Sequence, residues 1–327
     1  MSDGIKRLVR FGLHRLGGLR PLFWRSRNKF RILTYHRFAP HLYPSVEEDL
    51  NRQCEFLKQH FELVPMAEIA KSLQSGRHLP PNALAITIDD GYRDFLLNAF
   101  PVFRQWKIPA TVFLITDFLD GKLWPWWNQV DYAALHTNLP SVTISLRPGG
   151  FPQTLRLDGR EHKDQAISTI CAQVVKVPNQ TRLHFLRALP DLFQVELPVH
   201  PPVEYSPLTW DEVRSLAQTG IEFGAHTITH PILPSLKDPE SIYGEIAGSG
   251  KRVEQELGRA PLHFCYPNGD FNEAALQSVE RCGFQTAVTV RAGMNVPGEP
   301  RYLLKRLSVD PGMPDYYFRE LLAGLHF

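Results

Sequence analysis

Short apolar segments alternate with amphipathic ones along most of this chain, and this alternation constrains the fold more than any other feature of the sequence. Residues 83–88 and 110–115 are almost continuously apolar or β-branched, as strands of a buried parallel sheet are. Residues 31–35 and 221–225 give a similar signal, and residues 46–57 carry apolar side chains at helical spacing. Repeated β–α units of this kind imply an α/β chain with a parallel sheet or barrel.

Two capping-box patterns indicate where helices should begin. In a capping box, a Ser or Thr side chain accepts from the backbone N–H three residues later, and a Glu at that later position reaches back. Ser45 with Glu48, and Thr209 with Glu212, have this spacing. We therefore expect one helix to start just after Ser45 and another just after Thr209.

Residues 119–206 interrupt the alternation. A Trp-rich turn is followed by a hairpin pattern with residues 148–150 at its tip, by two helical patterns and by a Pro-rich return. The helical patterns cover residues 162–176 and 180–194. We interpret the whole stretch as a subdomain inserted into the barrel, so that residues 31–327 form one domain with an insertion.

The two ends of the chain differ in charge. The chain of 327 residues is 43% hydrophobic with a formal net charge of +2, which excludes a disordered chain. Residues 1–31 carry nine Lys or Arg and one Asp, whereas the remainder carries 27 basic and 33 acidic residues. Residues 1–30 are therefore a basic leader on a mildly acidic body, which suggests an anionic partner for the leader. The four Cys show no CxxC spacing, and we expect them to be reduced, as in the cytoplasm.

Apolar residues of the leader recur at roughly helical spacing with Arg between them, which is typical of an amphipathic helix on a membrane surface. A helix docked on the fold and a frayed terminus are the other interpretations. The sequence contains no apolar run long enough for a secretory signal or a membrane span. On the membrane interpretation, the chain is cytoplasmic and contacts the inner face of the membrane peripherally. Because the body is acidic and lacks a nucleic-acid motif, we expect no nucleic-acid partner.

Two adjacent carboxylates follow the strand at 83–88 directly, in the sequence TIDDG, and they are Asp89 and Asp90. The carboxyl ends of parallel strands are where α/β folds build their sites, and adjacent residues there can point to different places. One acid can then bind a metal while the other faces a substrate. A plain turn is the other interpretation, because Asp-Gly is also ordinary turn chemistry.

Two histidines follow the strand at 221–225 in the sequence HTITH, and they are His226 and His230. Side chains four residues apart share one face of a helical turn and can converge on one ion. Together with Asp90, they make a set of two imidazoles and one carboxylate that leaves positions open for water and substrate.

The two motifs together resemble those of the polysaccharide deacetylase family, also called carbohydrate esterase family 4 or the NodB-homology fold. The first family motif, T-F-D-D-G, corresponds to TIDDG at 87–91, and the second, H-[ST]-x-x-H, corresponds to HTITH at 226–230. The resemblance covers roughly residues 30–118 and 207–310, on either side of the insertion. It implies an α/β fold, a distorted (β/α) barrel of the NodB type with an inserted subdomain.

The resemblance also implies roles for the motif residues. Asp90, His226 and His230 would bind a divalent metal, with Zn²⁺ as the first expectation and Co²⁺, Ni²⁺ and Mn²⁺ as alternatives. Asp89 would be the general base that takes a proton from the attacking water.

The third family motif, R-x-P-[aromatic], is altered in this chain. The matching letters C-Y-P-N put Cys265 at the position of the Arg and Asn268 at the position of the aromatic residue. What orients Asp89 is therefore open, with Arg306 and Arg93 as candidates, each of which could instead be an ordinary salt-bridge partner. A backbone N–H near Asn268 would help to hold the oxyanion.

The late L-x-H motif that supplies the general-acid His of the family is missing near the C-terminus. Instead, Tyr35-His36 ends the first strand and resembles the Y-H element of the circularly permuted branch of the family, which includes deacetylases of poly-β-1,6-N-acetylglucosamine. The first and last strands of a closed barrel are neighbours, so a His from the first strand can reach the same site. The resemblance implies that His36 protonates the leaving amine, and a buried or capping His is the other interpretation.

The implied activity is metal-dependent removal of N-acetyl groups from N-acetylhexosamine units of a polysaccharide or lipid-linked saccharide, with release of acetate. The candidate contacts to the acetylated saccharide or its oxyanion are Tyr92, Tyr266, Asn268 and Arg306. Trp124, Trp126 and Trp127 either line a sugar groove or pack in the core. The alternatives are hydrolysis of another amide or of an O-acetyl ester at the same site, and a non-catalytic carbohydrate-binding relative.

Overall fold

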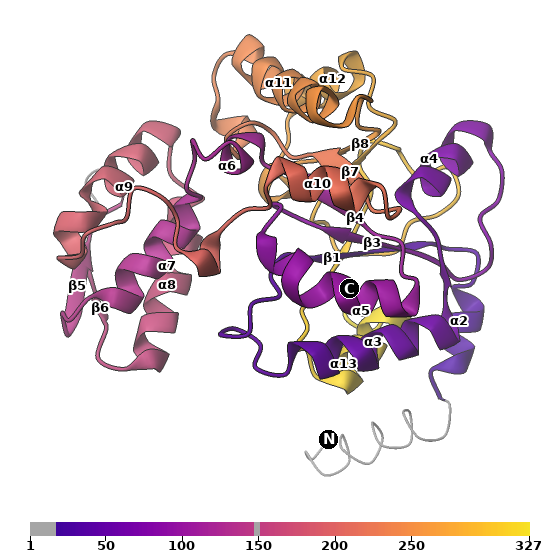
Figure 1. Cartoon of the computed structure of the whole chain (residues 1–327), viewed down its shortest axis with the longest axis horizontal. Helices are drawn as coiled ribbons and strands as arrows, with labels where there is room; N and C mark the ends of the chain where they lie inside the picture. The colour runs from indigo at the N-terminus through magenta and orange to yellow at the C-terminus, as the bar shows by residue number, and fades with distance from the viewer. Residues whose placement is uncertain (1–17, 147–150) are drawn as a thin grey trace.

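A curled parallel sheet wrapped by helices forms the main body of the computed structural model, which describes residues 18–146 and 151–327 (Figure 1). The strands of this sheet, in chain order, are Arg31–Tyr35 (β1), Glu62–Leu63 (β2), Ala83–Ile88 (β3), Thr111–Leu114 (β4), Glu222–Ala225 (β7), His263–Cys265 (β8), Thr286–Val288 (β9) and Leu307–Ser308 (β10). All six residues of β3 are buried, which explains the continuous apolar run in its sequence.

The strand order across the sheet is β10-β1-β3-β4-β7-β8-β9, and β2 pairs with β3. Leu33 of β1 lies opposite Leu307 of β10 on one side and Ile86 of β3 on the other, and both pairings are parallel. The two ends of this order meet through a parallel bridge between Val288 and Leu304, three residues before β10. The prediction of a distorted barrel with neighbouring first and last strands is therefore confirmed.

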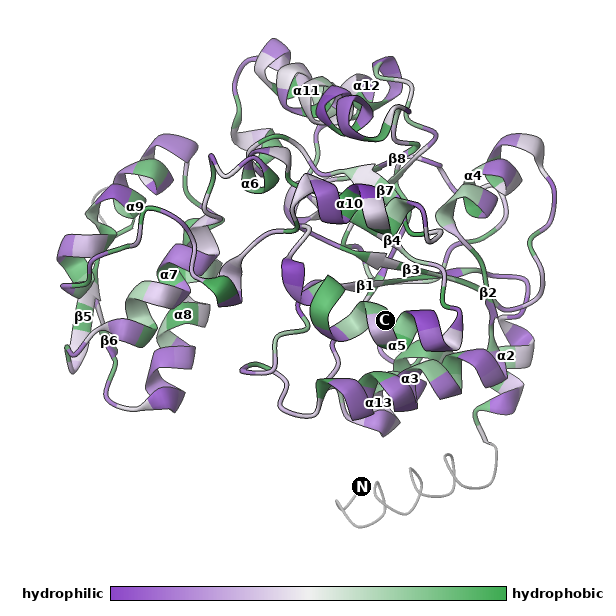
Figure 2. Cartoon of the chain, in the orientation of Figure 1, coloured by the Kyte–Doolittle hydropathy of each residue, from purple (hydrophilic) through white to green (hydrophobic). Residues whose placement is uncertain are grey.

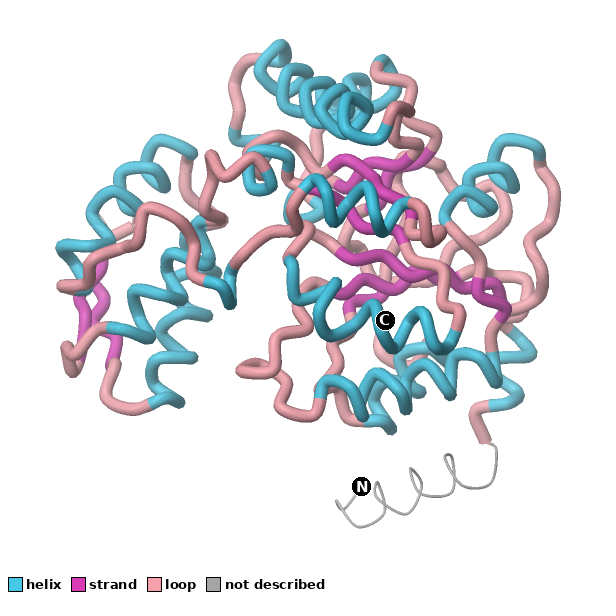
Figure 3. Tube along the Cα trace, viewed as in Figure 1, coloured by secondary structure: helices cyan, strands magenta, loops and turns pink. Residues whose placement is uncertain are grey.

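Helices cover the outside of the sheet, as Figure 3 shows. The helices of the barrel are Arg20–Arg25 (α2), Val46–His60 (α3), Met66–Ser75 (α4), Phe100–Trp106 (α5), Thr116–Leu119 (α6), Trp210–Ala217 (α10), Pro239–Leu257 (α11), Glu273–Arg281 (α12) and Asp315–Ala323 (α13), and a π-helix at Phe95–Ala99 leads into α5. The strands are mostly hydrophobic, whereas the helices mix hydrophobic and hydrophilic residues (Figure 2). This pattern fits helices that turn one face to the sheet and the other to solvent.

The two capping predictions have different outcomes. At the start of α10, Thr209 and Glu212 form the complete capping box. At the start of α3, the helix begins just after Ser45 as expected, but the Ser45 side chain makes no capping hydrogen bond, so the capping box is not formed there. The backbone explains the difference, because Thr209 is extended with ψ 157° whereas Ser45 has ψ 34°. A side chain caps well only from the extended conformation.

The inserted subdomain stands beside the barrel (Figure 1). It contains Trp126–His136 (α7), an antiparallel hairpin of Ser141–Ile144 (β5) and Gln153–Arg156 (β6), Arg160–Val174 (α8) and Asn179–Phe193 (α9). These elements pack around their own hydrophobic cluster, which includes Val130, Ile170 and Leu189. The chain returns to the barrel at Pro207, which pairs with Tyr92 just after β3.

Only the end of the basic leader falls within the described residues. There, Leu19 and Phe23 are buried, and the Phe23 ring lies 5.3 Å from that of Phe61 and 6.2 Å from that of Phe56. Residues 1–17, on which the prediction of an amphipathic helix mainly rests, lie outside the described part. Among the described helices, none combines the length and the apolar character needed to cross a membrane.

Candidate active site

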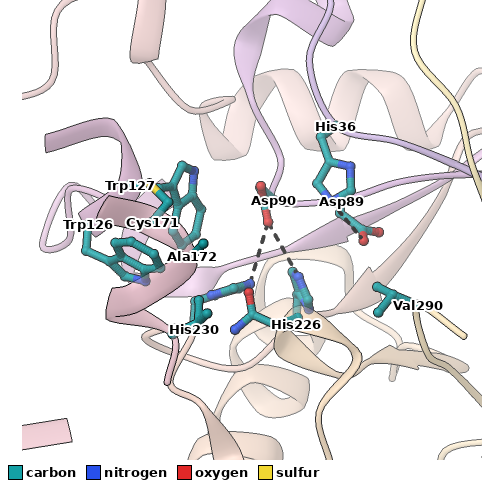
Figure 4. Close-up of a pocket in the computed structure, with 12 residues that line it drawn as sticks. His36, Asp89, Asp90, Trp126, Trp127, Cys171, Ala172, His226, His230 and Val290 are labelled. Atoms are coloured by element: carbon teal, nitrogen blue, oxygen red, sulfur yellow. Dashed lines mark ion pairs between the residues drawn. The ribbon is translucent and has the colours of Figure 1, made fainter. Parts of the chain in front are cut away.

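Residues from three strand ends meet at the carboxyl edge of the sheet. Asp89 and Asp90 follow β3, His226 follows β7, and His36 follows β1. Their side chains line one cavity together with His230 (Figure 4). The motif residues predicted to act together are thus brought together by parallel strands that end side by side.

Asp90, His226 and His230 form a compact buried cluster. The Asp90 Oδ1 atom lies 3.4 Å from His226 Nε2 and 3.9 Å from His230 Nε2 (Figure 4). One possible ligand atom from each of the three lies within 4.8 Å of the others. Ligand atoms about 2.1 Å from a tetrahedral ion are roughly 3.4 Å apart, so the three side chains match a Zn²⁺-type site in donor chemistry and spacing.

The backbone around this cluster adopts conformations that few side chains tolerate. Asp90 and His230 have φ values of 74° and 54°, in the left-handed region. Gly91 also has a positive φ of 81°, and a Cβ atom there would come within 2.8 Å of Leu114 Cδ2. The glycine of TIDDG is therefore required by both conformation and space, and strained residues of this kind gather at functional sites.

Neighbouring groups orient the two histidines. The His226 Nδ1 atom lies 2.8 Å from the carbonyl oxygen of Cys265, so it carries the proton and leaves Nε2 free to face Asp90. The Glu245 carboxylate of α11 accepts hydrogen bonds from the backbone N–H groups of Ile228 and Thr229, at 2.9 Å each. Burial lowers the pKa of His230 to about 3, which keeps that ring neutral and able to bind a cation.

Asp89 makes a buried bidentate ion pair with Arg306. Its Oδ1 and Oδ2 atoms each lie 2.7 Å from a guanidinium nitrogen of Arg306, which is 1% exposed. Burial opposes ionisation of Asp89, but attraction and hydrogen bonding to Arg306 outweigh it, and the pKa of the carboxyl is well below its usual value. Asp89 is therefore a carboxylate at neutral pH.

His36 is the most exposed of the histidines in the cavity. Its side chain is 44% exposed, and its Nε2 atom lies 3.6 Å from Asp89 Oδ2. It thus faces the same acid that Arg306 holds, from the open side of the cavity (Figure 4). An exposed imidazole beside a fixed carboxylate can exchange protons with both substrate and solvent.

The cavity has a volume of about 380 Å³, and its far wall comes from the inserted subdomain. Trp126 and Trp127 of α7 form part of this wall, and the Trp127 ring lies 4.7 Å from that of His230. The remainder comes from the end of α8 and the residue after it and consists of Cys171, Ala172 and Val175. No sequence motif predicts these α8 residues, because nothing in the sequence of this helix links it to the two motifs.

The model of the polysaccharide deacetylase family matches residues 76–287. The chain belongs to this family. A Bacillus subtilis protein named as a polysaccharide deacetylase, YxkH, is 34% identical over 118 residues, which cover 36% of this chain and 42% of that protein. The poly-β-1,6-N-acetyl-D-glucosamine N-deacetylase of Staphylococcus epidermidis is 32% identical over 78 residues, 24% of this chain and 27% of that protein. The chain thus aligns with less than half the length of these relatives.

Solved structures of other deacetylases share the fold. IcaB from Ammonifex degensii superposes with a TM-score of 0.60 at 18% identity, covering 91% of this chain and 97% of that one. The deacetylase PplD of Streptococcus pyogenes, solved with acetate, gives a TM-score of 0.57 at 16% identity, with 87% and 94% covered. The NodB-type architecture is therefore shared with these structures, although the sequence identity to them is only 16–18%.

This member of the deacetylase family departs from the family pattern at the partner of Asp89. Cys265, at the position of the family Arg, is buried, and its Sγ atom lies 3.2 Å from Arg306 Nη2 and 3.5 Å from Asp89 Oδ2. Although Asp89, Cys265 and His226 are close enough to hold an ion, the guanidinium of Arg306 bonds Asp89 and Cys265 directly. Arg93 pairs with Glu212, whereas Arg306 bonds Asp89 directly, so of the two candidates it is Arg306 that orients the acid.

The structure corrects three of the candidate substrate contacts. Arg306 is buried behind Asp89 and does not line the cavity. Tyr92 is also buried, and its hydroxyl accepts hydrogen bonds from Trp127 Nε1 and Asn128 Nδ2 at 2.7 and 2.8 Å, so it supports the wall instead of forming it. Tyr266 is buried in the hydrophobic cluster near α12. Burial of apolar rings between strand and helix explains both tyrosines.

Asn268 does line the cavity, in the left-handed conformation with φ 53°. Its Nδ2 atom is buried and has no hydrogen-bond partner among the described residues. An unpaired amide donor beside two carboxylates and three imidazoles is available to a ligand oxygen. The other Trp of the predicted groove, Trp124, does not line this cavity.

Proposed function

We propose that this chain is a metal-dependent hydrolase that removes N-acetyl groups from N-acetylhexosamine units of a polysaccharide or lipid-linked saccharide and releases acetate. The observation that carries the proposal is that the two adjacent acids, Asp89 and Asp90, have different partners. Asp90 faces two histidines, whereas Asp89 is held by Arg306 and faces His36. This arrangement separates a metal-binding acid from a proton-accepting one within a single dipeptide.

Asp90, His226 and His230 would hold the metal, since they are buried, close together and suitably oriented. The chemistry supplied by a bound Zn²⁺-type ion is polarisation of the acetamide carbonyl and a lower pKa for water. Mn²⁺, Co²⁺ and Ni²⁺ accept the same donor set and are the alternatives to Zn²⁺.

The residues around the metal site supply the proton transfers of amide hydrolysis. Asp89, ionised because of Arg306, takes a proton from the attacking water. The Asn268 side-chain amide donates to the oxygen of the acetyl group as negative charge develops on it. His36 gives a proton to the sugar nitrogen as the C–N bond breaks, because an amide anion is a poor leaving group. The products are acetate and the free amino sugar.

Acetate release is the direct test. The purified full chain is incubated with N-acetylglucosamine oligomers and with lipid-linked N-acetylhexosamine saccharides, with and without a chelator, and acetate and bound metal are measured. Release that the chelator abolishes and added Zn²⁺ restores is the expected result. Release from O-acetyl sugars alone would support an esterase, and binding of sugars without release from any substrate would support a non-catalytic relative.

We also propose that the leader, residues 1–30, contacts the inner face of the membrane and that the enzyme is cytoplasmic. The leader is strongly basic, and in its described part Trp24 is 67% exposed with Arg27 stacked on its ring at 4.2 Å. An exposed Trp among cations is typical of a surface that enters a lipid headgroup layer.

Co-sedimentation with vesicles of phosphatidylglycerol and phosphatidylcholine tests the membrane contact. Deletion of residues 1–17 removes Lys6, Arg7, Arg10 and Arg15 and leaves the buried Leu19 and Phe23 in place. Binding to anionic vesicles that falls severalfold in the deletion variant supports the contact. Equal binding by both proteins would contradict it.

A further inference from the structure

A second cavity adjoins the catalytic one, and no step of the proposed reaction uses it. It has a volume of about 610 Å³ and lies between the inserted subdomain and the loop after β7. Trp126, Trp127 and His230 line both cavities. The two cavities therefore adjoin at these three side chains.

Three residues that line the second cavity carry buried N–H donors without an acceptor among the described residues. Arg182 of α9 is only 4% exposed, and its Nη1 atom has no hydrogen-bond partner among the described residues. The Nε1 atoms of Trp124 and Trp126 are also buried and unpartnered within the described chain. Guanidinium and indole nitrogens only donate, so these groups need an acceptor that the described residues do not supply.

The charge of the lining is positive. Arg182 donates one hydrogen bond, at 2.5 Å, to the neutral side chain of Asn179, and neither Arg182 nor Arg187 forms an ion pair with a described residue. The acid in the lining is Glu245, whose oxygens already accept from the backbone and side chain of the second motif. Two arginines and one carboxylate thus line the cavity, which gives its lining a net positive charge.

A buried arginine is stable only when an opposite charge compensates its own and acceptors bond its N–H groups. A phosphate or carboxylate group offers several acceptor oxygens and a negative charge, and arginine binds both with particularly good geometry. The indole N–H groups add donors of the kind that bind oxyanions in closed sites. Burial lowers the pKa of Arg182, because desolvation disfavours its charged form.

We propose that the second cavity binds an oxyanion carried by the saccharide substrate, a phosphate or a carboxylate next to the sugar whose N-acetyl group lies at Asp89 and Asp90. This inference rests on the proposed function. It makes the preferred substrate an anionic saccharide, and it assigns Arg182 and Arg187 to substrate selection.

Product-like sugars test the subsite without turnover. Dissociation constants of the metal-loaded full chain are measured by calorimetry for glucosamine, glucosamine 1-phosphate, a glucosaminyl-uronate disaccharide and inorganic phosphate. The wild type should bind at least one anionic sugar about tenfold or more tightly than glucosamine, because hydrogen bonds to charged groups are strong. Whether the 1-phosphate or the uronate gains the most identifies the anion.

Two arginine variants and one control locate the effect. Arg187→Gln changes an exposed side chain, and Arg182→Gln changes the buried one, with circular dichroism checking that both fold. Either change should reduce the preference for the anionic sugar severalfold or more. Arg156→Gln, on β6 and paired with Asp158 outside the cavity, should leave it unchanged.

Equal binding of neutral and anionic sugars by the wild type would overturn the subsite, even if the enzyme releases acetate. A preference that survives both arginine variants would overturn it as well. Arginine-dependent binding of inorganic phosphate, without acetate release from any acetylated sugar, would instead overturn the proposed function and uphold the anion site.

Discussion

The catalytic cavity has two unlike walls. The barrel wall carries two acids and three histidines, together with Asn268 and Val290, and hydrogen bonds, ion pairs or backbone conformation fix the acids and histidines. The insertion wall consists of two Trp rings and three small or apolar side chains from α7 and α8. The barrel wall carries the groups that move protons and bind cations, whereas the insertion wall offers mainly shape and apolar surface. We infer that the reaction is set by the barrel and the choice of substrate by the insertion.

The largest effects should come from the two adjacent acids of the barrel wall. Asp89→Asn and Asp90→Asn should each lower kcat by about 10³-fold or more, because one removes the base and the other a metal ligand. Metal analysis should separate them, since Asp89→Asn should keep the metal and Asp90→Asn should lose most of it. Asp211→Asn, at an acid whose side chain is 90% exposed, serves as the control. If the Asp89→Asn variant keeps its activity, Asp89 is not the general base.

The next largest effect should come from His36. His36→Gln should lower kcat on an N-acetyl sugar by about 10²-fold and leave metal content unchanged, because only protonation of the leaving nitrogen is removed. With p-nitrophenyl acetate, whose leaving group needs no proton, the loss should be small. Equal losses on both substrates would show that His36 does not act as the acid.

The motif residues of the barrel wall could be predicted from the sequence because their causes are local. The apolar run before Asp89 predicts a buried strand, which is β3, and the positive φ at the following turn requires Gly91. Parallel strands then bring the ends of β3 and β7 together whatever lies between them. The insertion of residues 119–206 therefore did not hide the site.

The remaining features depend on contacts between distant parts of the chain. Arg306 reaches Asp89 across 217 positions, and a basic residue near a late strand has many possible partners. Tyr92 follows the acids directly, yet it is buried beneath Trp127 instead of facing the substrate. Ala172 of α8 faces the cavity only because the subdomain packs against the barrel. Tertiary packing decides each of these three cases, and local patterns do not encode it.

Arg306 gives a prediction about pH. Arg306→Met removes the cation that opposes the effect of burial, so the pKa of Asp89 should rise above its usual value. Asp89 must be ionised to act as a base, and the acidic limb of the kcat/KM profile should therefore move to higher pH. Activity at pH 6 should fall by about tenfold or more and recover partly at pH 9.

Stability should change in the same variant. Leaving the Asp89 carboxylate buried without its partner should lower the free energy of unfolding at neutral pH by about 3–5 kcal/mol, measured by urea denaturation. Arg306→Lys keeps the charge and should shift the acidic limb less. Arg93→Met, which breaks the pair with Glu212 at a partly exposed position, should alter neither the limb nor stability by much. If the acidic limb of the kcat/KM profile lies at the same pH in Arg306→Met as in the wild type, Arg306 does not control the pKa of Asp89.

The smallest effect should come from the insertion wall, and it should appear in a different kinetic constant. Ala172→Leu adds apolar volume to a cavity of about 380 Å³ without touching any proton-transferring group. It should raise KM about tenfold, leave kcat and metal content nearly unchanged, and spare short substrates more than long ones, since it removes binding and not transition-state chemistry. Thr169→Leu, on α8 but outside the cavity, should change nothing. If Ala172→Leu lowers kcat instead of raising KM, the insertion wall takes part in the reaction itself, and the division between the two walls is wrong.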